Sequence, residues 1–205
     1  MRRSLAIALL VCALAGSAAG QAQTTDVAGA KFPNTLQLAG TRLQLNGAGI
    51  RHKLVFKVYA AGLYLTDKAA TPEAALAAAG PKRLQVVMLR EIDGNELGKL
   101  FTKGMEQNAP REEFSKSIAG ILRMSDILSN RKKLQVGESF AIDRVPGTGT
   151  VISVNSVREG APIKEPEFYS ALIKIWLGKS PADPLLKEAL LGRAPSAVPG
   201  TSGYN

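Results

Sequence analysis

The chain has 205 residues and carries 26 Lys and Arg against 17 Asp and Glu, so its formal net charge is +9. It contains one histidine, His52, and one cysteine, Cys12, which excludes the usual zinc ligand sets and a disulfide framework. Apart from residues 131–133, which we interpret as a solvated loop, the cations are scattered, and this argues against nucleic-acid binding. A weak attraction to an anionic membrane surface or to an acidic ligand stays open.

The first 22 residues are predicted to be a cleavable signal peptide. Arg2 and Arg3 precede an apolar stretch at residues 5–15, and small residues follow. The apolar stretch is shorter than the about 20 residues that a membrane-spanning helix needs, so a retained anchor is disfavoured. The bulky Val11 before Cys12 argues against a lipoprotein. We therefore expect a periplasmic or secreted product without a transmembrane span.

The segment after this leader predicts β-strands. Apolar and polar residues alternate at residues 36–38 and 43–45, which predicts a hairpin, and the glycine-rich residues 46–49 predict a second turn. Residues 54–65 are β-rich and mostly apolar, so they predict a long central strand, bent or bulged at Gly62.

The middle of the chain predicts three helices and one further strand. Thr71 and Pro72 begin a short alanine-rich helix, and residues 83–90 return as a strand. Asp93 can cap a second helix, and Pro110 begins a third. The second helix carries Leu97, Leu100, Phe101 and Met105 at helical spacing. The third carries Phe114, Ile118, Ile121 and Leu122 in the same way.

The last part of the chain predicts a hairpin followed by two helices. Residues 139–143 and 150–157 alternate on either side of a Pro/Gly turn. A helix then begins at Pro166, and a shorter one follows Asp183. Strands, helices, strands and helices in this order predict an α+β fold, with a largely antiparallel β-sheet packed against helices.

Residues 24–192 are expected to form one domain, and the Ala/Pro/Gly-rich residues 193–205 are predicted to be a disordered tail. No motif predicts a cofactor or a metal site. A Ser/His/Asp triad would depend on His52, and no Gly-x-Ser-x-Gly segment supplies its nucleophile. The tripeptide GKS at residues 178–180 follows a helix and lacks the first glycine of a phosphate loop, so we interpret it as a helix stop.

Four polar side chains enter an otherwise apolar strand region: Arg51, Lys53, Lys57 and Tyr59. Even steps separate them, so an unbroken strand would place all four on the same face. This face is interpreted either as the solvent-exposed side of the sheet or as the wall of a cleft that holds an anionic or phenolic ligand.

Several segments resemble the chalcone isomerase superfamily, especially its bacterial chalcone isomerase-like branch, and they cover most of residues 33–192. They are GAGIR at residues 47–51, FKVYAAGLYL at 56–65, PGTG at 146–149, IWLGKSP at 175–181 and PLLKEALLG at 184–192. The resemblance implies an open-faced sheet backed by helices, with a ligand cleft between the two layers.

The resemblance also implies roles for residues. Plant enzymes of the family close a chalcone to a flavanone, and Arg51 matches their arginine, which steers the phenolate. Tyr59 stands where these enzymes carry threonine, and non-catalytic members bind fatty acids. We therefore expect a small amphipathic ligand, with Arg51 as anion anchor, Tyr59 as hydrogen-bond partner and Lys57 beside them. The alternatives are an isomerase acting on a chalcone-like enone, and an interaction module whose cleft is filled by its own side chains.

Overall fold

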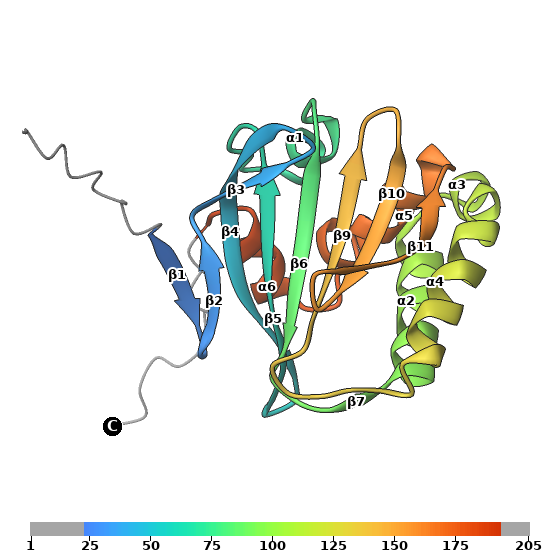
Figure 1. Cartoon of the computed structure of the whole chain (residues 1–205), viewed down its shortest axis with the longest axis horizontal. Helices are drawn as coiled ribbons and strands as arrows, with labels where there is room; N and C mark the ends of the chain where they lie inside the picture. Colours follow the sequence, from blue (N-terminus) through green and yellow to red (C-terminus); the bar gives the residue numbers. More distant parts are fainter. Residues whose placement is uncertain (1–22, 194–205) are drawn as a thin grey trace, which may run out of the picture.

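The computed structural model describes residues 23–193 and is built around one seven-stranded β-sheet (Figure 1). The strand order is β11-β10-β9-β6-β5-β4-β3, and every neighbouring pair is antiparallel. Helices pack against this sheet, so the predicted α+β class with an antiparallel sheet is confirmed. The expected signal peptide and all of the expected tail except Arg193 lie outside the described residues.

The predicted elements occur in the predicted order, and the structure adds short strands that were not predicted from the sequence, β1, β2, β7 and β8. The strands are β1 (Thr24–Val27), β2 (Ala30–Pro33), β3 (Thr35–Leu38), β4 (Thr41–Lys53), β5 (Phe56–Leu65), β6 (Lys82–Met88), β7 (Ile92–Asp93), β8 (Lys133–Leu134), β9 (Ser139–Val145), β10 (Gly149–Val154) and β11 (Val157–Ile163). The helices are α1 (Pro72–Ala77), α2 (Gly94–Asn108), α3 (Arg111–Lys116), α4 (Ile118–Asn130), α5 (Pro166–Leu177) and α6 (Pro184–Leu190).

The predicted helix starts at Thr71 and Asp93 are confirmed by their caps. The side chain of Thr71 accepts a hydrogen bond from the backbone N–H of Ala74, and Asp93 accepts one from Glu96. These bonds satisfy N–H groups that have no partner within the first turn of a helix.

The predicted turn at residues 46–49 is wrong, because β4 runs through this segment with only a shift of its pairing register between Leu45 and Gly47. A Cβ on Gly47 would lie 2.0 Å from the carbonyl oxygen of Ala189, and one on Gly49 would lie 2.6 Å from the Cβ of the same alanine. These glycines therefore let α6 approach the backbone of the strand. The buried side chain of Asn46 fixes this approach by donating hydrogen bonds to the carbonyl oxygens of Ala69 and Leu190.

The predicted strand over residues 54–65 starts two residues too early. Leu54 and Val55 form the turn of the β4–β5 hairpin, and β5 begins at Phe56. From there β5 continues through Gly62, where a Cβ would lie 2.6 Å from the Phe32 ring. β5 has β4 on one side and β6 on the other, so its predicted central place is confirmed.

The helix predicted to begin at Pro110 is divided at Ser117 into α3 and α4. This division changes which side chains are buried. Ile121 is buried as expected, whereas Ile118 and Leu122 of the predicted apolar side are exposed. Met124 and Leu128 complete the buried side of α4.

The predicted strand over residues 150–157 is in fact two strands. It ends at residue 154, and the edge strand β11 begins at residue 157. Asn155 and Ser156 between them have φ values of 49° and 67°. Two consecutive residues with positive φ are typical of a tight hairpin turn, in which asparagine is favoured.

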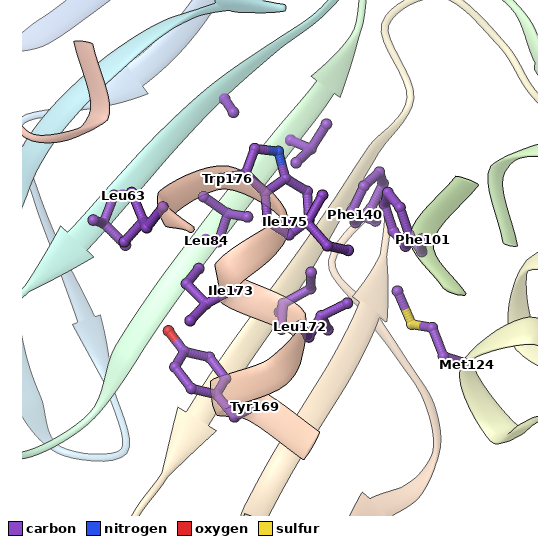
Figure 2. Close-up of a cluster of buried hydrophobic side chains, with 14 of the residues drawn as sticks. Leu63, Leu84, Phe101, Met124, Phe140, Tyr169, Leu172, Ile173, Ile175 and Trp176 are labelled. Carbon is purple, nitrogen blue, oxygen red and sulfur yellow. The ribbon is translucent and has the colours of Figure 1, made fainter. Parts of the chain in front are cut away.

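The main core lies between the sheet and the helical layer. Figure 2 shows Trp176 and Ile175 of α5 over the strands, with Phe140 and Phe101 beside them. The Phe101 ring packs edge-to-face against both Phe140, at 5.7 Å between centroids, and Trp176, at 5.4 Å. Such contacts add to the free energy gained by burying the rings. Within residues 23–193, no helix has the length and apolar character needed to cross a bilayer.

Candidate functional site

A cavity of about 290 Å³ lies between one end of the sheet and the helical layer. Arg51 and Tyr59 contribute from the sheet, and the opposite wall comes from α2, α5 and the loop that follows α5. The apolar members of the lining are Leu97, Leu100, Phe101, Ile175, Pro181 and Ala182. Lys103 and Gln107 of α2 also line the cavity. The cavity thus places a few polar groups, among them a guanidinium and a phenol, beside apolar side chains, which is the arrangement expected at a small-molecule site.

Arg51 and Tyr59 lie directly opposite each other on β4 and β5. The Arg51 guanidinium carbon is 5.6 Å from the centre of the Tyr59 ring, within the range of a cation–π contact. The Arg51 Nε is buried without a hydrogen-bond partner, and no carboxylate of residues 23–193 forms a salt bridge with this side chain. The guanidinium therefore lines the cavity with its charge unpaired by any described residue.

Tyr59 is 1% exposed, and its hydroxyl accepts a hydrogen bond of 2.8 Å from Nε1 of Trp176. Burial raises the pKa of Tyr59 to about 12, although Arg51 and the Trp176 bond each lower the pKa and Asp183 raises it. The phenol is therefore neutral at pH 7. Because its oxygen accepts from Trp176, its O–H proton can be donated to a ligand.

Asp183 fixes the end of β4 that carries Arg51. One carboxylate oxygen accepts a hydrogen bond of 2.7 Å from the backbone N–H of His52, and the other caps α6 by accepting from Leu185. The Nδ1 atom of His52 is 3.8 Å from this carboxylate. Among residues 23–193, no three His, Cys, Asp or Glu side chains are grouped to hold a metal ion.

Asn108 holds the loop that closes the cavity, a role that sequence reasoning missed. Its side-chain amide donates to the carbonyl oxygen of Ser180 and accepts from the Ser180 N–H, at 2.9 Å and 2.8 Å. A Cβ on Gly178 would lie 2.3 Å from the Asn108 Oδ1. Gly178 therefore ends α5, as predicted, and also makes room for this amide. No local signal in the sequence pairs residues 72 positions apart.

The four polar side chains predicted to share one face do not all meet. Arg51 and Tyr59 do, because they are cross-strand partners rather than members of one strand. The pairing register shifts after Arg51, so that His52 lies opposite Lys57, and both Val58 and Tyr59 pack into the main core. Lys57 is exposed and does not line the cavity.

Lys53 contributes to a second cavity, of about 350 Å³, next to the first. The two cavities share Arg51 and Leu100. Arg51 therefore lies where the two cavities adjoin.

The antiparallel sheet, the helical layer and the cleft at one sheet end define an α+β protein of the open-faced type. The chain matches the chalcone isomerase-like family over residues 24–192 and belongs to it. Its structure is similar to the crystal structure of a fatty-acid binding protein of Arabidopsis thaliana, with a TM-score of 0.62 and 14% identity. The match covers 80% of this chain and 92% of the plant protein, and at this identity it shows the fold alone. No curated protein sequence matches the chain.

We predict that Tyr59→Phe lowers the free energy of unfolding by about 1–3 kcal/mol, because it leaves the buried Trp176 N–H without an acceptor. The matched control is Tyr169→Phe, which removes a buried hydroxyl that has no hydrogen-bond partner among residues 23–193 and should cost less. Urea denaturation followed by the fluorescence of Trp176, the chain's one tryptophan, measures both. Equal destabilisation by the two variants would contradict a structural role for the Tyr59–Trp176 bond.

Proposed function

We propose that this protein binds a small amphipathic anion, with its carboxylate or phenolate against Arg51 and its apolar part along α2 and α5. The observation that carries the proposal is the unpaired guanidinium beside a buried phenol at an apolar cavity. A charge-assisted hydrogen bond from Arg51, supported by the O–H of Tyr59, would hold the anionic group. An open cavity also argues against the alternative of an interaction module with a filled cleft.

The size of the cavity bears on the ligand. About 290 Å³ is near the lower end of the roughly 300–1,000 Å³ typical of ligand sites. Such a volume suits one phenolic ring or a short acyl chain, and the second cavity beyond Arg51 gives a longer chain room to extend. The Arabidopsis protein of the same fold is described as fatty-acid binding, which supports an acyl carboxylate over a phenol.

We also propose that the protein belongs to the bacterial branch of the family and is exported. The branch assignment rests on the segments at residues 47–51 and 56–65. Export rests on the basic, apolar and small-residue order of residues 1–22, and the family match beginning at Thr24 is compatible with a leader that ends just before it.

Native mass spectrometry of protein purified from the periplasm tests export and ligand binding together. We expect an N-terminus between Gly20 and Thr24, and a small acidic molecule that leaves the protein on collisional activation. Retention of Met1 on the exported chain would contradict cleavage. A spectrum that shows only the mass of the chain itself, under conditions that keep other complexes intact, would contradict a tightly bound ligand.

Replacing Arg51 with alanine should weaken binding of a straight-chain carboxylate by about 1.5–3 kcal/mol, the contribution of a hydrogen bond to a charged group. Titration calorimetry with hexanoate, octanoate and dodecanoate measures the loss. Arg42→Ala, an exposed arginine on the same strand, controls for the change in net charge and should bind as the wild type does. If octanoate binds both variants equally well, Arg51 is not the anchor.

The alternative function is an isomerase that cyclises a chalcone-like enone, and we predict no efficient turnover of this kind. Tyr59 fills space beside Arg51, and its hydroxyl is held by Trp176. A misplacement of about 1 Å can cost on the order of 10²-fold in a reaction that depends on positioning. The decisive measurement is the loss of chalcone absorbance with wild-type protein. A rate well above the spontaneous one would favour the isomerase.

A further inference from the structure

The tip of the β4–β5 hairpin, residues 53–57, exposes three consecutive large apolar side chains. Leu54 is 89% exposed, Val55 84% and Phe56 50%. Hairpin turns usually carry small or polar residues, so three such side chains in water are unfavourable unless a partner covers them.

The backbone conformation at Leu54 is also unfavourable for a leucine. Its φ is 56°, in the left-handed region that favours glycine or asparagine. Leucine is thus disfavoured at this position both by conformation and by its contact with water. Packing in the core does not explain the leucine either, because Leu54 is not part of a buried cluster.

Cations surround the apolar tip. Lys53 and Lys57 flank it, and the guanidinium carbon of Arg90 lies 4.3 Å from the centre of the Phe56 ring. None of these three forms a salt bridge with another residue between 23 and 193. Three carboxylates lie close by. Glu91, Asp93 and Glu96 line the second cavity together with Lys53 and Arg90, and Glu91 pairs with Lys133.

A neighbouring loop extends this surface. The backbone N–H of Leu89 donates to the carbonyl oxygen of Val58, and the N–H of Gly137 donates to that of Met88. These bonds place Gly137, and with it the exposed Val136, beside the end of β6, the strand that pairs with the start of β5. Lys132, also exposed, lies in the same connection after α4. Figure 1 shows the hairpin and this connection at the same, lower end of the sheet.

We propose that this end of the sheet docks on an anionic lipid bilayer, with the hairpin tip inserted at the headgroup level. Apolar side chains that enter the interface and cations that face anionic headgroups are the two sources of peripheral membrane binding. A protein partner fits less well, because a stable protein interface takes about 800 Å² from each side, and the tip is a narrow projection.

The position of the tip connects docking to the cleft. Lys53, Leu54, Phe56 and Arg90 line the second cavity, which also contains Arg51. An amphipathic molecule that left the bilayer at the tip would therefore enter a cavity that contains Arg51. This path rests on the proposed function, whereas the docking itself needs no ligand in the cleft.

Co-sedimentation with vesicles tests the docking. The protein is purified from its host in the form that accumulates there, and its intact mass identifies the N-terminus. The vesicles are phosphatidylcholine alone, or equal parts of phosphatidylcholine and phosphatidylglycerol. We expect binding to the anionic vesicles that weakens as salt is raised. Leu54→Asn with Val55→Ser should reduce it at least about tenfold. Lys53→Gln with Lys57→Gln should reduce it about fivefold for each charge removed.

Matched controls separate the tip from the rest of the surface. Leu122→Ser removes an exposed leucine from α4, and Lys164→Gln removes an exposed cation that follows β11 at the other end of the sheet. Both should bind vesicles as the wild type does. Leu54→Asn suits the positive φ and Val55 is exposed, so the melting temperature of the variant with Leu54→Asn and Val55→Ser should be unchanged or raised, and its loss of binding then cannot come from unfolding.

Three outcomes would overturn the proposal. The first is wild-type protein that stays in solution with anionic vesicles, and the second is equal binding by wild type and both tip variants. The third is association of wild type with itself, abolished by Leu54→Asn with Val55→Ser and without vesicle binding, which would assign the tip to a second copy of the chain.

Discussion

The hydrogen bond between Tyr59 and Trp176 is the contact on which the cleft depends. It joins the centre of the sheet to α5 across 117 positions of sequence, and both side chains are almost completely buried. Trp176 also packs edge-to-face against Phe101 of α2. These contacts hold together β5, α5 and α2 at one position, and the Tyr59 ring at that position is the one that Arg51 covers.

A second constraint fixes Arg51 itself. Gly47 and Gly49 admit α6 against β4, and Asp183 at the start of that helix accepts the N–H of His52. The helix therefore holds β4 along its length and again at the residue after Arg51. Tyr59 lies opposite Arg51, so the guanidinium is positioned by backbone contacts and a ring face, without a carboxylate. This leaves its charge for a ligand.

Local signals in the sequence predicted most elements, and the failures have physical causes. Helix starts at Thr71, Asp93 and Asp183 were predictable because a cap acts over three residues. The glycines at residues 47 and 49 look like a turn, because the sequence does not show that the helix they accommodate lies some 140 positions later.

The candidate site shows the same limit. Arg51 and Tyr59 were expected on one face because even steps separate them, yet they meet across a hairpin. The turn was missed because Leu54 and Val55 carry none of the usual turn residues. The roles of Trp176 and Asn108 depend on contacts with distant segments, so no pattern near either residue indicates them.

The chemistry available at Tyr59 favours binding over proton transfer. A general base works best when its pKa is near the working pH, whereas burial raises the pKa of Tyr59 to about 12. Tyr59 is better suited to donate a hydrogen bond, because its oxygen already accepts one from Trp176 and its proton can be donated to a carboxylate. Arg51 lowers the pKa of Tyr59, and an anion that neutralised the guanidinium would weaken this effect and make the phenol harder still to ionise. Occupation of the cleft would therefore move Tyr59 further from the state that a base requires and keep it as a hydrogen-bond donor.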